Sequence, residues 1–177
     1  MKKFFDNQFE NTTTGRGLYV ARISPGVKKK KLVVATCHLK RPSPPDMNST
    51  QRVSNAKEAL KRLHPAPNVV LGGDMNWDES SDGPFPLVGR WCDAWFTLRP
   101  EEDGWTYDTK SNGMISRKRS LQRRLDRFIC KLKDFKMIGI DMIGTEAIPG
   151  ISYERNGKML PVLPSDHYGL ILTICPK

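Results

Sequence analysis

The sequence lacks the long apolar run that a membrane-spanning protein needs. Its longest stretch without a charged residue is eleven residues, Leu63 to Gly73, and contains two prolines. A transmembrane helix requires about 20 mostly apolar residues. The chain also opens without the basic, apolar and small-residue succession of a secretory signal. These absences exclude a transmembrane helix and a readable export signal.

Cysteine is scarce as well. The four cysteines, Cys37, Cys92, Cys130 and Cys175, are widely spaced, with no C-x-x-C pair and no histidine at ligand spacing. This pattern argues against a zinc site. Three of the four lie inside strand-like runs, where we expect buried free thiols. The cysteines therefore indicate an intracellular, reducing compartment.

Positive charge is abundant. The 177 residues include 29 basic and 19 acidic residues, a net charge of +10, and the length suits one domain. This surplus fits a polyanionic partner, although soluble basic proteins without one carry similar charge. From Lys110 to Arg124 there are six basic residues and no acidic one, directly after Trp105 and Tyr107. Aromatic rings beside a basic loop suit single-stranded nucleic acid, and a solvated loop is the alternative.

Hydrophobic periodicity predicts more strands than helices. Val53, Ala56, Leu60 and Leu63 recur at helical spacing, so one amphipathic helix ends before Pro65. One strand–helix–strand unit followed by antiparallel pairs indicates a mixed α/β fold with a largely buried sheet. The strands are expected at 18–23, 32–39, 68–71, 124–131, 135–143 and 168–174, with a short helix at 93–98.

Four short motifs could carry chemistry. In the first, Asp74 and Asn76 follow a predicted buried strand and two glycines, so a carboxylate and an amide can point into one cleft. A carboxylate can orient and deprotonate water, and an amide can donate to a phosphate oxygen. The alternative is an ordinary Gly-Gly-Asp turn in which Asn76 caps a loop.

The other motifs are equally ambiguous alone. Asp166 and His167 precede the last predicted strand, and His38 ends an earlier one. An aspartate beside a histidine can fix its tautomer or raise its pKa, or can simply satisfy a turn. Asp126 and Arg127 lie inside a strand pattern, where a structural salt bridge is at least as good an explanation as a catalytic role. The basic loop described above is the fourth motif.

The order of these motifs resembles the endonuclease/exonuclease/phosphatase superfamily, and within it the 5′-tyrosyl-DNA phosphodiesterase branch. The likeness runs from about Gly15 to Ile174. It implies part of a four-layer, DNase I-like α/β sandwich, with a mixed, mostly antiparallel sheet and flanking helices. The matching stretches are Thr36–Leu39, Gly73–Asn76, Trp105–Thr109, Leu125–Arg127 and Pro164–Leu170.

The resemblance also implies roles for the matching residues. Asp74 would be the general base, Asn76 would contact the scissile phosphate, and His167 would stabilise the transition state with support from Asp166. His38 would hydrogen-bond the phosphate. The residues implied in substrate binding are His38, Trp77, Tyr107, Leu125 and Arg127.

The implied cofactor is Mg²⁺, with Mn²⁺ as a substitute. No segment matches the family's first-half Asn motif or the following Glu, its principal Mg²⁺ ligand, which leaves Asp166 as the one candidate metal ligand. We therefore expect the N-terminal half of the sandwich to be missing, with residues 1–14 a polar segment and 15–177 the C-terminal part of the domain.

The implied activity is Mg²⁺-dependent hydrolysis of 5′-phosphotyrosyl–DNA links, in nuclear repair of topoisomerase–DNA adducts. The expected partner is DNA carrying a 5′-tyrosyl adduct, without a membrane. Three alternatives remain open: a catalytically deficient module that binds DNA or protein, an abasic-site endonuclease and a phosphoinositide phosphatase.

Overall fold

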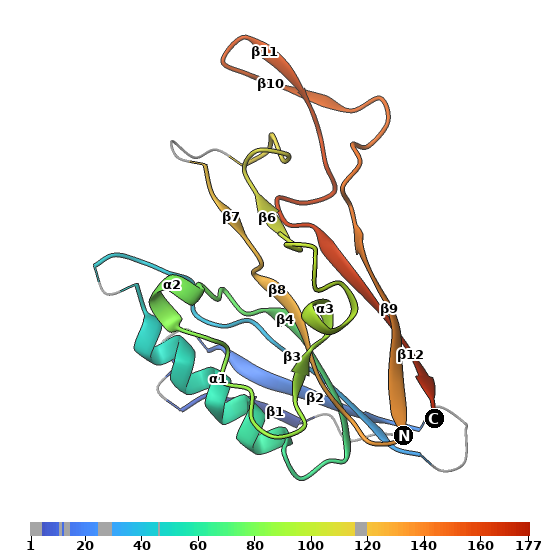
Figure 1. The fold of residues 1–177 in the computed structure, drawn as a ribbon. Helices are drawn as coiled ribbons and strands as arrows, with labels where there is room; N and C mark the ends of the chain where they lie inside the picture. The colour runs from blue at the N-terminus through green and yellow to red at the C-terminus, as the bar shows by residue number, and fades with distance from the viewer. Residues whose placement is uncertain (1–4, 11, 13–14, 25–29, 46, 116–119) are drawn as a thin grey trace.

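A six-stranded sheet forms the centre of the molecule (Figure 1). The computed structural model describes residues 5–10, 12, 15–24, 30–45, 47–115 and 120–177. In spatial order the strands are β1 (Phe5–Gln8), β2 (Gly17–Ile23), β3 (Leu32–Cys37), β4 (Asn68–Asp74), β8 (Asp126–Leu132) and β5 (Cys92–Asp93). Neighbouring strands are antiparallel except for β3 and β4, which are parallel.

Different elements cover the two faces of this sheet (Figure 1). Helix α1 (Ser49–Leu63) packs on one face, and the antiparallel pair of β9 (Phe135–Ile143) and β12 (Gly169–Pro176) packs on the other. Because side chains alternate along a strand, Val69 of β4 lies in the core under α1 and Val70 lies in the core shared with β9. The described residues therefore form a helix layer and two sheet layers.

Short elements complete the fold around these layers. They are α2 (Glu79–Asp82), α3 (Ala94–Leu98), β6 (Tyr107–Asp108), β7 (Gln122–Arg123), β10 (Ser152–Arg155) and β11 (Lys158–Pro161). The hairpin of β10 and β11 projects away from the central sheet (Figure 1).

The structure confirms the predicted mixed, mostly antiparallel sheet with flanking helices. The strand expected at 124–131 begins only at Asp126, because the N–H groups of Leu125 and Asp126 donate to the Thr106 hydroxyl where the ladder would otherwise start. Residues 117–119 of the basic loop lie outside the described residues. Within the described ranges, no helix is long and apolar enough to cross a membrane.

Helix α1 buries one charged residue, Arg52, on the face that packs against the sheet. Arg52 Nε and Nη2 donate to the two carboxylate oxygens of Asp82, the last residue of α2, at 2.7 and 2.6 Å. Both side chains are fully buried. Burial alone would raise the pKa of Asp82, but hydrogen bonds from Arg52 and the Asp78 amide hold that pKa below its ordinary value.

Removing Arg52 should be costly, because Asp82 would then be a buried carboxylate without its cation. We expect Arg52→Met to lower the free energy of unfolding by about 3–5 kcal/mol. The matched change Arg62→Met removes only a partly exposed pair with Glu58 on the same helix and should cost at most about 1 kcal/mol. Urea unfolding at neutral pH measures the free energy of unfolding of both variants.

The pH dependence has a definite sign. A depressed folded pKa contributes stability that is present above the ordinary carboxyl pKa of 3.8 and is lost as the pH falls through the lower folded value. The difference in the free energy of unfolding between wild type and Arg52→Met should therefore shrink only at acidic pH. Equal losses from Arg52→Met and Arg62→Met at neutral pH would contradict the buried-pair interpretation.

Candidate active site

Two aspartates face each other at one end of the central sheet. Asp74 ends β4 and Asp126 begins β8, and the strand register makes their Cα atoms direct partners. Partners across an antiparallel ladder project their side chains from the same face. His38 comes directly after β3, and His167 lies just before β12. The structure therefore gathers residues from the ends of four strands that are separated in sequence.

The carboxylate of Asp74 is held by three contacts. His38 Nε2 lies 3.2 Å from Oδ2, the Asn76 backbone N–H donates to Oδ1 at 2.8 Å, and Asn76 Nδ2 donates to Oδ2 at 3.2 Å. Burial raises the pKa of Asp74, and the nearby charge of Asp126 raises it further, against the opposing effect of the Asn76 N–H bond. A carboxylate with a raised pKa is a stronger base toward water.

Asn76 is fixed by its own backbone as well as by its side chain. Its φ is +47°, in the left-handed region that asparagine tolerates better than most residues. Besides Asp74, its Nδ2 donates to the Leu39 carbonyl at 3.0 Å, and the residue is only 6% exposed. Both amide hydrogens are therefore engaged, so a phosphate contact requires one of these bonds to exchange.

The two histidines have opposite proton preferences. His167 Nδ1 lies 2.8 Å from Asp126 Oδ2, and this hydrogen bond raises the pKa of His167. Burial lowers the pKa of His38, against the attraction of Asp74, and the charge of Arg16 lowers it further. The site therefore favours an imidazolium at His167 and a neutral imidazole at His38. Such a separation of proton affinities is typical of acid–base catalysis.

The aspartate that supports His167 is Asp126 and not the predicted Asp166. Asp166 is exposed, and its Oδ1 lies 3.4 Å from the Ser165 hydroxyl. The prediction chose Asp166 because it adjoins His167 in sequence. The sequence places Asp126 in the matching stretch Leu125–Arg127 without indicating its partner, because that partner depends on the β4–β8 pairing. Its strand position was the available signal.

Two of the predicted substrate-binding residues lie beside this cluster. The Tyr107 ring meets the His167 ring edge-on, with ring centres 5.1 Å apart. Leu125, directly before Asp126, is partly exposed, and its carbonyl accepts from the Met75 N–H at 2.8 Å. Both residues therefore border the site.

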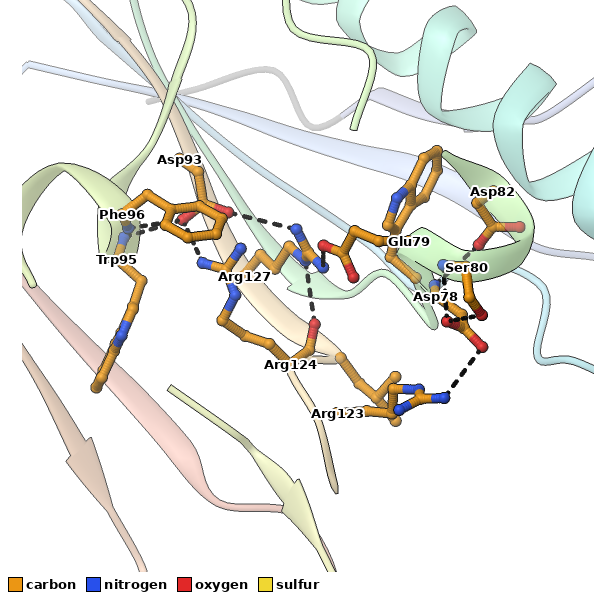
Figure 2. A network of polar contacts seen from close by, with 12 residues as sticks. Asp78, Glu79, Ser80, Asp82, Asp93, Trp95, Phe96, Arg123, Arg124 and Arg127 are labelled. Atoms are coloured by element: carbon orange, nitrogen blue, oxygen red, sulfur yellow. Dashed lines mark hydrogen bonds and ion pairs between the residues drawn. The ribbon is translucent and has the colours of Figure 1, made fainter. Parts of the chain in front are cut away.

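The structure corrects the predictions for Trp77 and Arg127. Trp77 is fully buried, donates from Nε1 to the Gly83 carbonyl at 2.9 Å and packs against Phe85, so it belongs to the core. Arg127 is 3% exposed and donates to Glu79 Oε1 at 2.5 Å (Figure 2). Neighbouring residues of a strand face opposite sides of the sheet, so Arg127 points away from the side that Asp126 faces.

Two arginines of the predicted basic loop form ion pairs within the protein. Arg124 is buried and donates from Nη1 to Asp93 Oδ1 at 2.8 Å, and Arg123 Nη2 lies 3.5 Å from Asp78 Oδ2 (Figure 2). These two cations are compensated by carboxylates. Lys110 remains exposed at the other end of the loop.

The residues present do not fit the predicted Mg²⁺ site. Mg²⁺ requires near-octahedral oxygen ligation and usually one or two carboxylates besides water or phosphate. In the described part of the chain, no group of three or more His, Cys, Asp or Glu side chains is placed to hold a metal ion. Both oxygens of Asp74 already accept hydrogen bonds, and the predicted ligand Asp166 belongs to no such group.

Asp126 should control the proton affinity of His167. We expect Asp126→Asn to lower the pKa of His167, because it removes the hydrogen bond and charge that raise that pKa. NMR titration of the imidazole signals measures the pKa, and His167→Gln assigns them. In the matched control Asp166→Asn, the pKa of His167 should fall less than in Asp126→Asn. A larger fall in Asp166→Asn would contradict the assignment of Asp126 as the partner of His167.

This raised pKa also fixes how the pair contributes to stability. A His pKa that is higher in the folded protein gives stability that is fully present below its ordinary value of 6.5 and is lost as the pH rises through the folded value. The destabilisation caused by Asp126→Asn should accordingly diminish toward alkaline pH.

The donor set also predicts weak binding of Mg²⁺ alone. We expect about 1 mM Mg²⁺ to leave the urea unfolding midpoint unchanged, because a ligand stabilises a fold only when its concentration approaches its Kd. The same titration on Asp166→Asn is the control. A clear wild-type stabilisation that Asp166→Asn abolishes would show that a metal site does form.

Sequence comparison relates this chain to known proteins. A model described as the endonuclease/exonuclease/phosphatase family matches residues 9–167. Tyrosyl-DNA phosphodiesterase 2 of Xenopus laevis is 27% identical over 170 residues, which cover 92% of this chain and 42% of that protein. The chain thus spans less than half the length of this curated relative.

Solved structures share the fold. D. rerio TDP2, crystallised with a single strand DNA product, is similar with a TM-score of 0.78 and 23% identity, over 98% of this chain and 68% of that one. Truncated Caenorhabditis elegans TDP2 is similar with a TM-score of 0.77 and 20% identity, over 97% and 65% of the two chains. Since the family model covers most of the sequence and the fold agrees, the chain belongs to the endonuclease/exonuclease/phosphatase family.

Proposed function

We propose that this site is a phosphodiesterase centre that acts on the 5′ end of DNA and hydrolyses a 5′-phosphotyrosyl link. The observation that carries the proposal is the convergence of Asp74, with its raised pKa, on the His167–Asp126 pair. The similarity to D. rerio TDP2, crystallised with a single strand DNA product, supports DNA as the substrate. DNA repair and a nuclear location belong to the same proposal.

In this reaction Asp74 accepts a proton from water as the water oxygen forms a bond to phosphorus. The His167 imidazolium donates to a phosphate oxygen as negative charge grows there, and Asp126 holds its ring in place. Asn76 exchanges one of its amide hydrogen bonds for the phosphate. Arg16, which donates to the His38 carbonyl at 3.0 Å, adds a positive charge beside His38.

The leaving group of this reaction departs with little assistance from the site. The bond from phosphorus to the tyrosine oxygen breaks, and tyrosine leaves as a phenolate that then takes up a proton. Because the ordinary tyrosine pKa is about 10, a phenolate is a much weaker base than an alkoxide and needs less assistance to depart. The products are 5′-phosphorylated DNA and tyrosine, with one water consumed.

The predicted Mg²⁺ dependence stands as part of the proposal and contributes no step to it. Relatives in this family are metal-dependent in general. The donor groups of the described residues do not form a metal cluster. This mismatch favours one second function, in which the chain binds DNA or a protein without hydrolysis.

A turnover assay separates the two functions. The substrate is an oligonucleotide with a 5′-tyrosyl group, assayed with Mg²⁺. We expect Asp74→Asn to lower kcat by about 10²–10⁴, the usual contribution of a positioned general base. Wild-type activity should also fall as the pH drops through the raised pKa of Asp74, because the protonated acid cannot accept a proton.

The control variant is Asp141→Asn, an exposed aspartate of β9 that pairs with Arg99 on the surface. It should leave kcat unchanged. Salt-dependent DNA binding without any Asp74-dependent cleavage would overturn the hydrolase and favour the binding module.

A further inference from the structure

A groove of about 500 Å³ opens between the second half of α1 and the segment at 86–91 that precedes β5. Leu60 of the helix and Leu87, Val88 and Trp91 of the segment line it, together with two prolines. Val88 is 64% exposed. The volume lies in the range typical of ligand pockets. None of the catalytic residues contributes to this groove.

Positive charge borders the apolar floor. Lys57 and Lys61 lie one helical turn apart on α1 and both line the groove, and no acidic residue is among the described residues that line it. Glu58, between them in sequence, is paired with Arg62 instead. A ligand that combines apolar groups with negative charge would complement this surface.

The far wall of the groove is held in place before any ligand binds. Lys131 Nζ donates to the His64 carbonyl and lies 5.5 Å from the centre of the Trp91 ring, so it joins the end of α1 to the far wall. Trp91 is 6% exposed, and its indole N–H has no acceptor among the described residues. These contacts therefore hold the groove in shape.

We propose that this groove docks a short acidic peptide segment of a partner protein, with apolar side chains on the floor and Asp or Glu side chains against Lys57 and Lys61. A peptide suits the groove better than a nucleic acid, because the floor is mainly aliphatic. Among the described residues that line it, Trp91 is too buried to offer a face for base stacking, which leaves the His64 imidazole as the one exposed aromatic ring.

Docking there leaves the catalytic centre open. Helix α1 starts beside the end of β3 and finishes where β4 begins, so the groove lies near the start of β4 and Asp74 lies at its end. The seven residues of β4 separate the two by roughly 20 Å. A partner bound in the groove could hold the enzyme at its site of action while DNA occupies the other end of the sheet.

A phage-displayed library of short random peptides tests the proposal on the full chain. Peptides are selected on the wild-type protein with an excess of the Lys57→Glu/Lys61→Glu variant as competitor. We expect enriched peptides in which apolar residues are flanked by Asp or Glu. Fluorescence anisotropy should show at least tenfold weaker binding to that variant and to Val88→Glu, with unchanged binding to the matched controls Lys136→Glu/Lys158→Glu and Ile138→Glu.

Circular dichroism and urea unfolding confirm that each variant is folded, and all the substituted positions are exposed. Three results would overturn the proposal: no enrichment, enrichment of basic peptides, or peptides that bind the groove variants as tightly as the wild type. A loss of single-stranded DNA binding in Lys57→Glu/Lys61→Glu, without acidic peptides, would assign the groove to nucleic acid instead.

Discussion

The pairing of β4 with β8 is the constraint on which the site depends. It sets Asp74 opposite Asp126 in a partly buried position, where two carboxylates repel each other. Each carboxylate is matched by a histidine from another strand end, Asp74 by His38 and Asp126 by His167. Moving the register by one residue would turn one of the two carboxylates to the opposite face of the sheet and dissolve the cluster.

The two Asp–His pairs, Asp74–His38 and Asp126–His167, have different properties. Burial and the charge of Asp126 raise the pKa of Asp74, whereas Asp126 stabilises the charged form of His167. The basic and the cationic functions are thereby placed on opposite strands of one ladder. A phosphate group between them could meet a base on one side and a positive charge on the other, which is the arrangement a phosphoryl-transfer reaction needs.

Sequence reasoning recovers the parts of this molecule that local pattern determines. The helix at Ser49–Leu63 and the long strands follow from apolar spacing, and Asp74, Asn76, His38 and His167 follow from their places at strand ends. Asp126 could not be assigned, since its partner is set by a strand pairing between residues about fifty positions apart. The predicted roles of Trp77 and Arg127 failed because nearness to a motif in sequence does not reveal which face of the sheet a side chain occupies.

Trp77 and Arg127 nevertheless help to explain why the site has its shape. Each is next in sequence to a site residue, Asn76 or Asp126, and each is fixed on the helix side of the sheet, Trp77 by Phe85 and Arg127 by Glu79. The Arg52–Asp82 pair holds the same loop against α1. Because a backbone cannot turn freely when its neighbour is locked in a core, these contacts keep Asn76 in its left-handed conformation and Asp126 in register. The face that carries the candidate site is therefore positioned by interactions on the opposite face of the sheet.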